Sequence, residues 1–136
     1  MVTPRDTALV SRFSAYGSAV EIGVGRRPEV AVGLADRGLS VTAVDVAEFD
    51  VPPSVAFVRD DVVDAAARDD PGDHYRADLL YGLNLPPELH RPTLAVATAV
   101  DADFLFTTLG YDSPSVSCST ESLAEGETLY VAREQS

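Results

Sequence analysis

The sequence predicts an α/β fold with three layers, α/β/α, around a mostly parallel sheet that ends in a short antiparallel C-terminal edge. Short apolar segments typical of buried strands alternate with helix-like segments along most of the chain. A turn with two glycines, Gly23 and Gly25, joins the first predicted strand to a helix, and Asp45 ends the next strand. Strand–helix–strand alternation builds parallel sheets with helices on both faces. The last two predicted strands have no strong helix between them, which indicates an antiparallel pair.

The first element is predicted to be a helix over residues 7–16. Its apolar side chains fall on one face at helical spacing, and either Asp6 or Thr7 can cap its N-terminus. Gly17 can adopt the left-handed conformation that commonly ends a helix. The first strand is therefore expected directly after this glycine.

The remaining elements continue the alternation. The predicted strands cover residues 18–23, 39–44, 55–59, 77–83 and 103–108, with two shorter ones over 115–119 and 128–133. The predicted helices cover residues 28–37, 61–68 and 87–100. Pro28 suits a first helical position, where its missing N–H costs nothing. Gly33, inside the same helix, is expected to let that helix lie close to the sheet. With no repeat and no linker, residues 1–136 are predicted to form one domain.

The charge balance is strongly acidic. The chain has 22 acidic residues against 10 basic ones, every basic residue is arginine, and the formal net charge is -12. This charge repels itself in dilute salt but is screened in multimolar salt, where the Debye length falls to about 3 Å or less. The composition resembles that of proteins from extreme halophiles; the alternative is a mildly acidic protein from ordinary salt. The charge also disfavours nucleic acid as a partner.

Other features limit the location and the chemistry. No basic stretch followed by an apolar run opens the chain, and no run approaches the ~18 apolar residues of a membrane span, so we expect a cytoplasmic protein that does not enter membranes. The one cysteine, Cys118, is expected to be reduced and structural. His74 and His90 form no metal-ligand pattern, so no metal site is predicted and both are expected to be solvated or to cap helices.

The chemistry is expected at the glycine turn. The segment 21–25 (Glu-Ile-Gly-Val-Gly) lies where a strand passes into a helix, so the glycines let a ligand approach the backbone and the helix N-terminus favours an anionic group above it. Asp45, at the end of the next strand, can accept two hydrogen bonds from a ribose diol. The pattern predicts a nucleoside-type ligand; the alternative is a structural turn beside a solvated aspartate. Pro28 replaces the third glycine of dinucleotide sites, which disfavours NAD.

The segment 20–25 followed by Val44-Asp45 resembles the first two motifs of the Rossmann-like S-adenosylmethionine-dependent methyltransferases. The resemblance implies that the acid and glycines of the turn border the methionine part of the ligand and that Asp45 binds the ribose. It further implies an acid near the adenine amino group, for which Asp60 is the better candidate; Asp61 can equally be a helix cap. Arg27 stands where many members have a third glycine.

The end of the fourth predicted strand, Tyr81-Gly82-Leu83-Asn84-Leu85-Pro86-Pro87, loosely resembles the Asn-Pro-Pro-aromatic motif of amino methyltransferases, with Leu85 intruding. A substrate would enter near Tyr81 and Asn84. Beside the glycine turn, Arg26 and Arg27 can pair with a ligand carboxylate or phosphate, or equally with the acidic surface. The residues predicted to contact the S-adenosylmethionine-type cofactor are Glu21, Gly23, Gly25, Asp45, Asp60, Tyr81 and Asn84.

Over nearly its whole length the chain resembles a small archaeal family, uncharacterised protein family 0146, which has a shortened methyltransferase-like fold and no established activity. Two functions stay open. One is a small S-adenosylmethionine-dependent methyltransferase, which would need a homodimer interface in place of the substrate-recognition insertion that this short chain lacks. The other is a non-catalytic nucleotide-sensing or protein-partner module on a degenerate methyltransferase fold. The sequence does not decide whether the chain is an enzyme.

Overall fold

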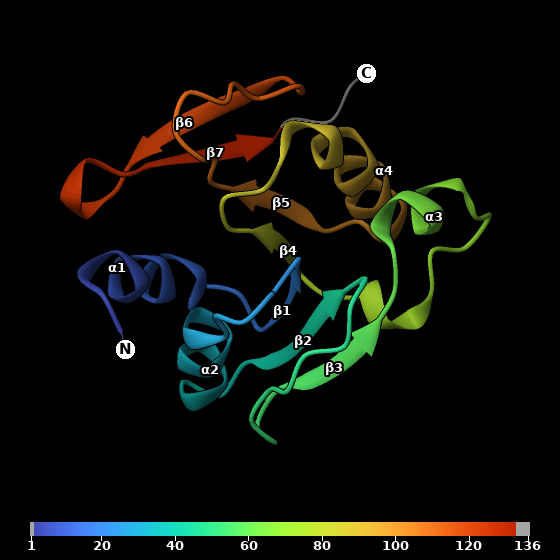
Figure 1. Ribbon diagram of the computed structural model, residues 1–136, viewed down its shortest axis with the longest axis horizontal. Helices are drawn as coiled ribbons and strands as arrows, with labels where there is room; N and C mark the ends of the chain where they lie inside the picture. The colour runs from blue at the N-terminus through green and yellow to red at the C-terminus, as the bar shows by residue number, and fades with distance from the viewer. Residues whose placement is uncertain (1, 133–136) are drawn as a thin grey trace.

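A computed structural model, which describes residues 2–132, contains one seven-stranded sheet of order β3-β2-β1-β4-β5-β7-β6 (Figure 1). The pairs among β1 to β5 are parallel, whereas β7 runs antiparallel to both β5 and β6. The strands are β1 (Ser18–Ile22), β2 (Ser40–Asp45), β3 (Ala56–Arg59), β4 (Leu79–Gly82), β5 (Asp103–Phe106), β6 (Cys118–Ser122) and β7 (Thr128–Ala132). The predicted α/β class, mostly parallel with an antiparallel C-terminal edge, is confirmed.

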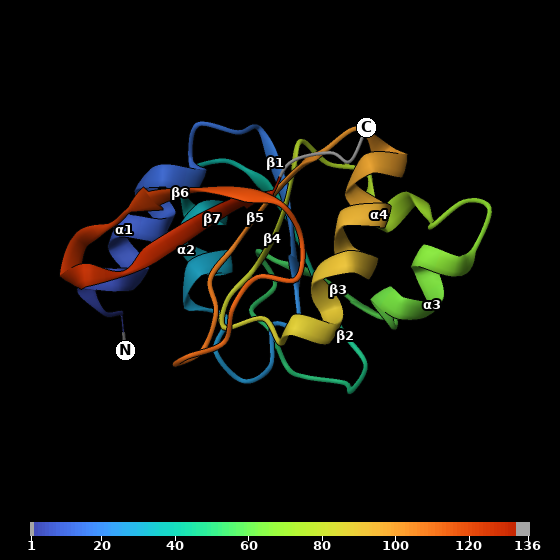
Figure 2. The same cartoon turned by 90° about the horizontal axis from the view of Figure 1, so that it is seen from above.

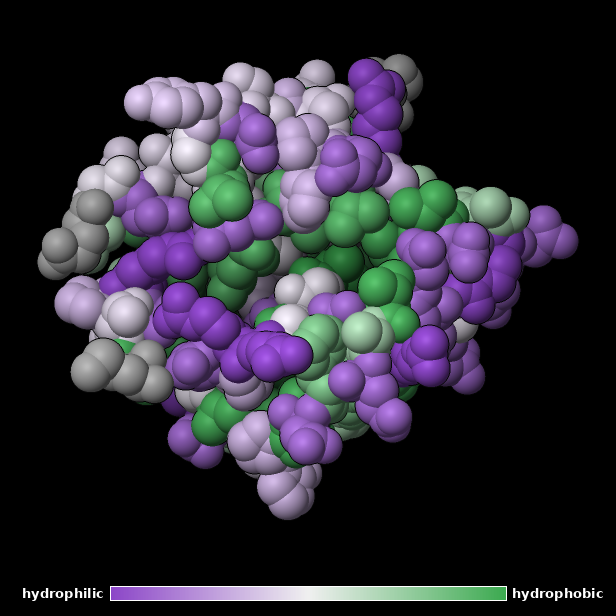
Figure 3. Space-filling model, viewed as in Figure 1, coloured by the Kyte–Doolittle hydropathy of each residue, from purple (hydrophilic) through white to green (hydrophobic). Residues whose placement is uncertain are grey.

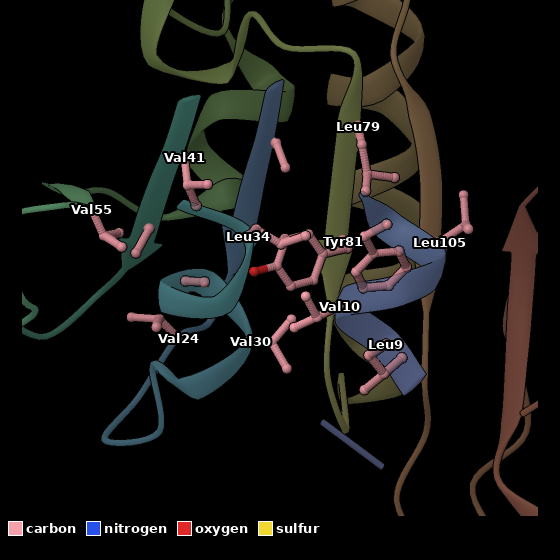
Figure 4. Close-up of a cluster of buried hydrophobic side chains, with 14 of the residues drawn as sticks. Leu9, Val10, Val24, Val30, Leu34, Val41, Val55, Leu79, Tyr81 and Leu105 are labelled. Carbon is pink, nitrogen blue, oxygen red and sulfur yellow. The ribbon is translucent and has the colours of Figure 1, made fainter. Parts of the chain in front are cut away.

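Helices cover both faces of this sheet, as Figure 2 shows. They are α1 (Pro4–Phe13), α2 (Glu29–Asp36), α3 (Val62–Ala67) and α4 (His90–Val100), with 3₁₀ turns η1 (Asp73–Tyr75), η2 (Pro87–Leu89) and η3 (Ala124–Gly126). One apolar core lies between the sheet and α1 with α2, and includes the fully buried Leu9 and Leu34 (Figure 4). A second core lies under α3 and α4, around Val96 and Phe106. None of the described helices is long and apolar enough to cross a membrane.

Helix α1 begins earlier than predicted. Thr3 is its N-cap, and a capping box joins the Thr3 hydroxyl to the Asp6 N–H while the Asp6 carboxylate accepts from the Thr3 N–H. Pro4 takes the first helical position, where a proline costs nothing. The helix ends at Phe13, and Gly17 is not among the residues with positive φ, so the predicted bounds 7–16 and the left-handed Gly17 cap are both wrong.

The first strand of the C-terminal hairpin lies three residues further along the chain than predicted. Strand β6 pairs with β7 from Cys118 opposite Ala132 to Ser122 opposite Thr128, so the predicted strand 115–119 is wrong in its bounds. The Leu123 N–H donates to the Glu127 carbonyl across the turn and fixes this register. Val116 is buried against the α4 core instead of joining the sheet. Residue 133 of the predicted strand 128–133 lies outside the described residues.

Gly33 allows α2 to approach α1. The sequence had suggested an approach to the sheet instead. A Cβ at this position would lie 2.7 Å from Cγ2 of Val10, far inside van der Waals contact. Because Val10 is β-branched and packed in the core, it has few rotamers with which to move away. The glycine therefore permits a close crossing of the two N-terminal helices.

Replacing Gly33 with Ala is expected to destabilise the protein by about 1 kcal/mol. Alanine gains roughly 1 kcal/mol of helix propensity, but overpacking a core costs about 1–3 kcal/mol. Unfolding in denaturant measures the change, and the double variant Val10→Ala, Gly33→Ala supplies the control because it removes the methyl group that would clash. A Gly33→Ala variant more stable than wild type would show that the helices can separate without cost.

Candidate functional site

The carboxyl ends of β1 and β4 mark the point where the strand order reverses direction. In open α/β sheets ligands bind in the crevice at such a point. The glycine loop after β1 and the loop after β2 lie along the lower edge of Figure 2, at the carboxyl ends of the strands. The space-filling view in Figure 3 shows hydrophobic side chains around a hollow in the middle of one face, with hydrophilic residues on both sides.

Two cavities meet at Gly23, which lines both. The larger, about 200 Å³, lies over the glycine loop and the end of β4, and its wall includes Glu21, Gly25, Arg5 and Asn84. The smaller, about 90 Å³, lies over the ends of β2 and β3. Its wall is mostly apolar and carries the carboxylates Asp45, Asp60 and Asp61. The two cavities together form an elongated site that bends over one glycine.

The glycines of the loop are required by their backbone conformation. Gly23 has φ +75° and Gly25 has φ +56°, in the left-handed region that residues with a Cβ seldom adopt. A Cβ built on either glycine meets nothing within 4 Å, so protein atoms do not fill the space above the loop. The Gly23 N–H donates to the Val44 carbonyl at 2.8 Å, which ties the loop to β2.

Asp45 holds the loop from the end of β2. Its Oδ2 accepts from the Gly25 N–H at 2.9 Å, and its Oδ1 accepts from the Ala47 N–H at 3.2 Å. An ionised carboxylate offers about four lone-pair sites, so roughly two remain for a ligand. The aspartate that the sequence predicts to bind a ribose therefore also anchors the glycine loop.

Glu21 is an acid inside the protein. Its side chain lines the larger cavity but is only 2% exposed, and its Oε1 accepts a 2.7 Å hydrogen bond from the Tyr81 hydroxyl. Burial raises the pKa of Glu21 to about 8; the Tyr81 hydrogen bond opposes the rise, and the nearby acids Glu29, Asp45 and Asp6 add to it. At neutral pH the cavity thus has a protonated carboxyl group in its wall.

Tyr81 supports Glu21 from below and lines neither cavity. Its ring is fully buried and lies against the Phe13 ring, with centroids 4.8 Å apart. In Figure 4 the ring stands between α1 and α2 with its hydroxyl oxygen turned toward β1. Burial, then the charge of Glu21 and its hydrogen bond, raise the pKa of the Tyr81 hydroxyl well above its usual value. Direct contact between Tyr81 and a ligand was predicted, but the structure places this side chain behind Glu21 and outside both cavities.

Asp60 is committed to protein donors. Its Oδ1 accepts from the Asp61 N–H and Arg68, and its Oδ2 accepts from Arg68, His74 and the Tyr75 hydroxyl, all within 3.2 Å. A carboxylate offers about four lone-pair sites, so five bonds leave Asp60 no acceptor site for a ligand. Burial acts to raise the pKa of Asp60, but the hydrogen bonds from Arg68, His74, the Asp61 N–H and Tyr75 lower it overall.

The neighbouring Asp61 is better placed for a ligand. It lines the same cavity and uses one oxygen, Oδ1, to cap α3 through the Val63 N–H. Its second oxygen has no protein donor among the described residues. The helix cap that the sequence offered as one role for Asp61 is confirmed, and Asp61 is also a candidate ligand contact. Asp60, the predicted contact, joins β3 to the η1 segment.

Asn84 lies at the mouth of the larger cavity in a left-handed conformation, with φ +51°. Its N–H donates to Oγ1 of Thr107 at 2.8 Å, and its side-chain Oδ1 accepts from Nη2 of Arg5 at 3.2 Å. Arg5 comes from α1 and also donates to Oγ1 of Thr107 at 2.9 Å. The sequence did not indicate Arg5 or Thr107, because no motif connects residues so far apart.

Comparison with known proteins places this chain in a family. The model of the Uncharacterised protein family (UPF0146) matches residues 5–135. The chain belongs to this family. A UPF0146 protein of Halobacterium salinarum is 41% identical over 134 residues, which cover 98% of this chain and 99% of that one. The resemblance to an archaeal family that the sequence suggested is confirmed.

Solved structures similar to this UPF0146 chain include two methyltransferases. Magnesium protoporphyrin IX methyltransferase (ChlM) from Synechocystis PCC 6803, with bound SAH, has a TM-score of 0.63 and 14% identity, and the match covers 96% of this chain and 84% of that one. A TehB-like SAM-dependent methyltransferase from Corynebacterium glutamicum has a TM-score of 0.61 and 15% identity, covering 96% and 86%. At these identities the likeness shows the fold alone, and the predicted Rossmann-like methyltransferase fold is confirmed.

The sequence predicted that both histidines of this UPF0146 chain are solvated or cap helices, whereas in the structure each side chain bonds a specific partner. His90 is fully buried against the Phe106 ring; its Nδ1 accepts from the Ser115 N–H, so its Nε2 donates to the Leu85 carbonyl at 2.9 Å. It thereby joins the loop after β4 to the loop before β6. His74 bonds Asp60, as described above. Among residues 2–132 no group of three His, Cys, Asp or Glu side chains is arranged to hold a metal ion.

Proposed function

We propose that this chain binds S-adenosylmethionine or S-adenosylhomocysteine along the two cavities and acts as a small methyltransferase. The observation that carries the proposal is the pair of cavities meeting at Gly23, with a buried acid on one side and carboxylates from the next two strands on the other. Structural neighbours such as the ChlM enzyme contain SAH, which supports the choice of ligand. The bound cofactor would supply an activated methyl group, and the protein would supply position and electrostatics.

The smaller cavity fits the nucleoside half of this ligand. Asp45 retains about two acceptor sites for a ribose diol, and the spare oxygen of Asp61 can accept from an exocyclic amino group. Apolar side chains between them, Ile22 and Val62, suit the face of a base. The volume of this cavity, about 90 Å³, is small compared with the roughly 300 Å³ or more of typical small-molecule sites, so part of the ligand would remain exposed.

The larger cavity fits the amino-acid half. Glu21 stands in its wall where a cationic amine can convert the buried acid to its carboxylate, because an opposite charge within ~4–6 Å favours ionisation. The methyl group would point toward the mouth at Asn84 and Arg5, at the end of β4. A methyl acceptor therefore enters between α1 and the loops after β4 and β5.

Thermal unfolding in concentrated KCl tests the proposal with S-adenosylmethionine, S-adenosylhomocysteine, NAD and ATP added separately. Each S-adenosyl compound at 100 times its dissociation constant is expected to add about 2.7 kcal/mol of stability. The Asp45→Ala variant is expected to lose this increment, since both the ribose acceptors and the anchor of the glycine loop are removed. Glu48→Ala, an exposed acid three residues further along the same loop, is the matched control and should keep it. Equal shifts in both variants would disprove the assignment of Asp45.

A second candidate function is a non-catalytic nucleotide-sensing or partner-binding module. The observation that favours it is the exposure of large apolar side chains in loops that follow strands, Val46 after β2 and Leu109 and Tyr111 after β5. Side chains of this kind beside a ligand site suit contact with a second copy or another protein. Ligand-induced stabilisation without methyl transfer to any acceptor would favour this function, and no stabilisation by any nucleotide would leave only the partner-binding role.

The proposal also covers the cellular location of the protein and the salt concentration in which it works. We infer that the protein works in the cytoplasm of a salt-rich cell, with a nucleoside-type small molecule as ligand and without nucleic acid. The support is the acidic composition, with 22 acidic residues and no lysine, together with the relative from Halobacterium salinarum. The binding experiments above accordingly use concentrated KCl, in which the self-repulsion of the chain is screened.

A further inference from the structure

The polar groups at the mouth of the larger cavity are donors. Arg5 can only donate, so the side-chain oxygen of Asn84 must face it, and the 3.2 Å bond between them uses one of the two lone pairs of that oxygen. The remaining end of the Asn84 side chain is its NH₂ group, which has no acceptor among the described residues. The oxygen lies beside the Arg5 guanidinium, whose positive charge repels an approaching cationic amine.

Arg5 keeps donors for a ligand. Its Nη2 is used by Asn84 and Thr107, and its Nε lies 3.3 Å from Oε1 of Glu127 without forming a hydrogen bond. Nη1 forms no hydrogen bond with an acceptor among residues 2–132, and Arg5 is part of the cavity wall. Both N–H groups of Nη2 are thus used and Glu127 lies beside Nε, so Nη1 is the end of the guanidinium that can still donate to one oxygen of an oxyanion.

The charge of the wall points the same way. The chain has only ten basic residues, and three of them, Arg5, Arg26 and Arg27, line this cavity. Two acids of the wall, Asp6 and Glu29, lie 3.8 Å from Arg27. Arg26 is exposed and has no ion pair recorded within the described part of the chain. With Glu21 protonated, the three guanidinium groups are balanced by Asp6, Glu29 and the Glu127 carboxylate beside Arg5, so this cavity lacks the negative excess of a protein whose net charge is -12.

We propose that the mouth formed by Arg5, Asn84 and Arg26 is an anion subsite that holds a carboxylate or phosphate group of the methyl acceptor. The inference rests on the proposed function, which makes this mouth the entrance for an acceptor. It replaces the amine that the loose Asn-Pro-Pro resemblance suggested, because the side-chain oxygen of Asn84 faces Arg5, and the guanidinium groups of Arg5 and Arg26 repel a cationic amine. The acceptor is then an acidic small molecule or the acidic end of a larger one.

The test uses inorganic phosphate as the probe on the full chain. Potassium phosphate is titrated against KCl at constant ionic strength, with the side-chain N–H signals of the arginines followed by NMR, in the presence and absence of S-adenosylhomocysteine. Phosphate is expected to shift the Arg5 signal and the Asn84 side-chain amide in a saturable way, while methylammonium chloride shifts neither. Arg5→Gln is expected to weaken phosphate binding about tenfold or more, and Arg5→Lys by less, since lysine keeps the charge but not the bonds that hold the guanidinium in place.

Arg12→Gln is the matched control. Arg12 lies on the same helix and binds Glu121 of the same hairpin at 2.8 Å, but it does not line the cavity, so its loss should leave phosphate binding unchanged. Equal phosphate affinity in wild type and Arg5→Gln would overturn the proposal. So would shifts by methylammonium in place of phosphate.

Two further arms separate the sources of the anion. If S-adenosylhomocysteine displaces phosphate but 5′-methylthioadenosine, which lacks the amino-acid carboxylate, does not, then the arginines hold the cofactor's own carboxylate and the acceptor subsite is disproved. If phosphate and S-adenosylhomocysteine bind together, the acceptor subsite is supported. If S-adenosylhomocysteine fails to bind at all, the proposed function fails, while the phosphate titration of Arg5→Gln still decides whether the mouth binds anions.

Discussion

Replacing Glu21 with Gln is expected to stabilise the protein by about 2–3 kcal/mol at pH 7 and to weaken binding of S-adenosylmethionine. Burial raises the pKa of Glu21 from 4.5 to about 8, so the folded protein holds a proton there that the unfolded chain releases at neutral pH. Glutamine keeps the shape and the oxygen that accepts from Tyr81, without an acid to neutralise. The site would thus lose function and gain stability, as is common where strain serves binding.

The sign follows from proton binding. Between pH 4.5 and about 8 the native state binds more protons than the unfolded state at Glu21, so the unfolding free energy falls as pH rises across this interval. Each pH unit is worth about 1.4 kcal/mol for a full proton difference. Below pH 4.5 both states are protonated and the contribution of Glu21 to stability is complete; above about 8 the loss no longer grows.

Unfolding in denaturant at several pH values, in constant KCl, measures this effect. The difference between Glu21→Gln and wild type should increase from pH 5 to pH 8. Glu29→Gln removes a charge from the same cavity wall at a partly exposed position, and its difference from wild type should change less over that interval. A Glu21→Gln difference that stays constant with pH would show that Glu21 is ionised in the folded protein.

Replacing Asp60 with Ala is expected to cost about 2–4 kcal/mol, the largest loss that we expect from one surface-proximal carboxylate. The substitution leaves the hydroxyl of the fully buried Tyr75 and the ring of His74 without their common acceptor, and a buried polar group left unsatisfied costs about 1–3 kcal/mol. Asp61→Ala, the adjacent acid, should cost only about 1 kcal/mol, because it loses a helix cap.

The pH dependence of the unfolding free energy gives a second test of the role of Asp60. Its pKa is lowered in the folded protein from the usual 3.8, so its contribution is present at higher pH and is lost as pH falls through the folded-state value. The stability gap between wild type and Asp60→Asn should therefore narrow below about pH 4. Equal costs for Asp60→Ala and Asp61→Ala at pH 7 would contradict the assignment of Asp60 to the η1 segment.

The parts of the fold that could be predicted from sequence are those fixed by local pattern. The alternation of apolar strands with helices determined the parallel sheet, and the glycines at 23 and 25 are needed for positive φ angles that a local turn demands. Asp45 was placed correctly at the end of β2 because a strand brings its last residue to the sheet edge. These inferences depend on neighbours in sequence.

The parts that could not be predicted depend on partners distant in sequence. Asp60 and Asp61 are equivalent in local pattern, and only Arg68, His74 and Tyr75, which fold back on β3, distinguish them. The sequence around His90 gives no local sign that the Ser115 N–H will donate a hydrogen bond to its ring. The earlier start of α1 was a different failure, since the Thr3 to Asp6 capping box was visible but has aspartate where glutamate is usual.

The pairing of the two ends of the chain affects the order of folding. Helix α1 precedes the other described elements in the chain, yet Arg12 bonds Glu121 across 109 residues, and Arg5 bonds Thr107 across 102 and faces Glu127 of the β6–β7 hairpin. Contacts of such sequence separation form late, after local units have assembled. A nascent chain that has passed Thr107 already contains the glycine loop and the hydrogen-bond partners of Arg5, but the pairs of Arg12 with Glu121 and of Arg5 with Glu127 require β6 and β7. The contacts that hold α1 against the β6–β7 hairpin are therefore the last of these to form during synthesis.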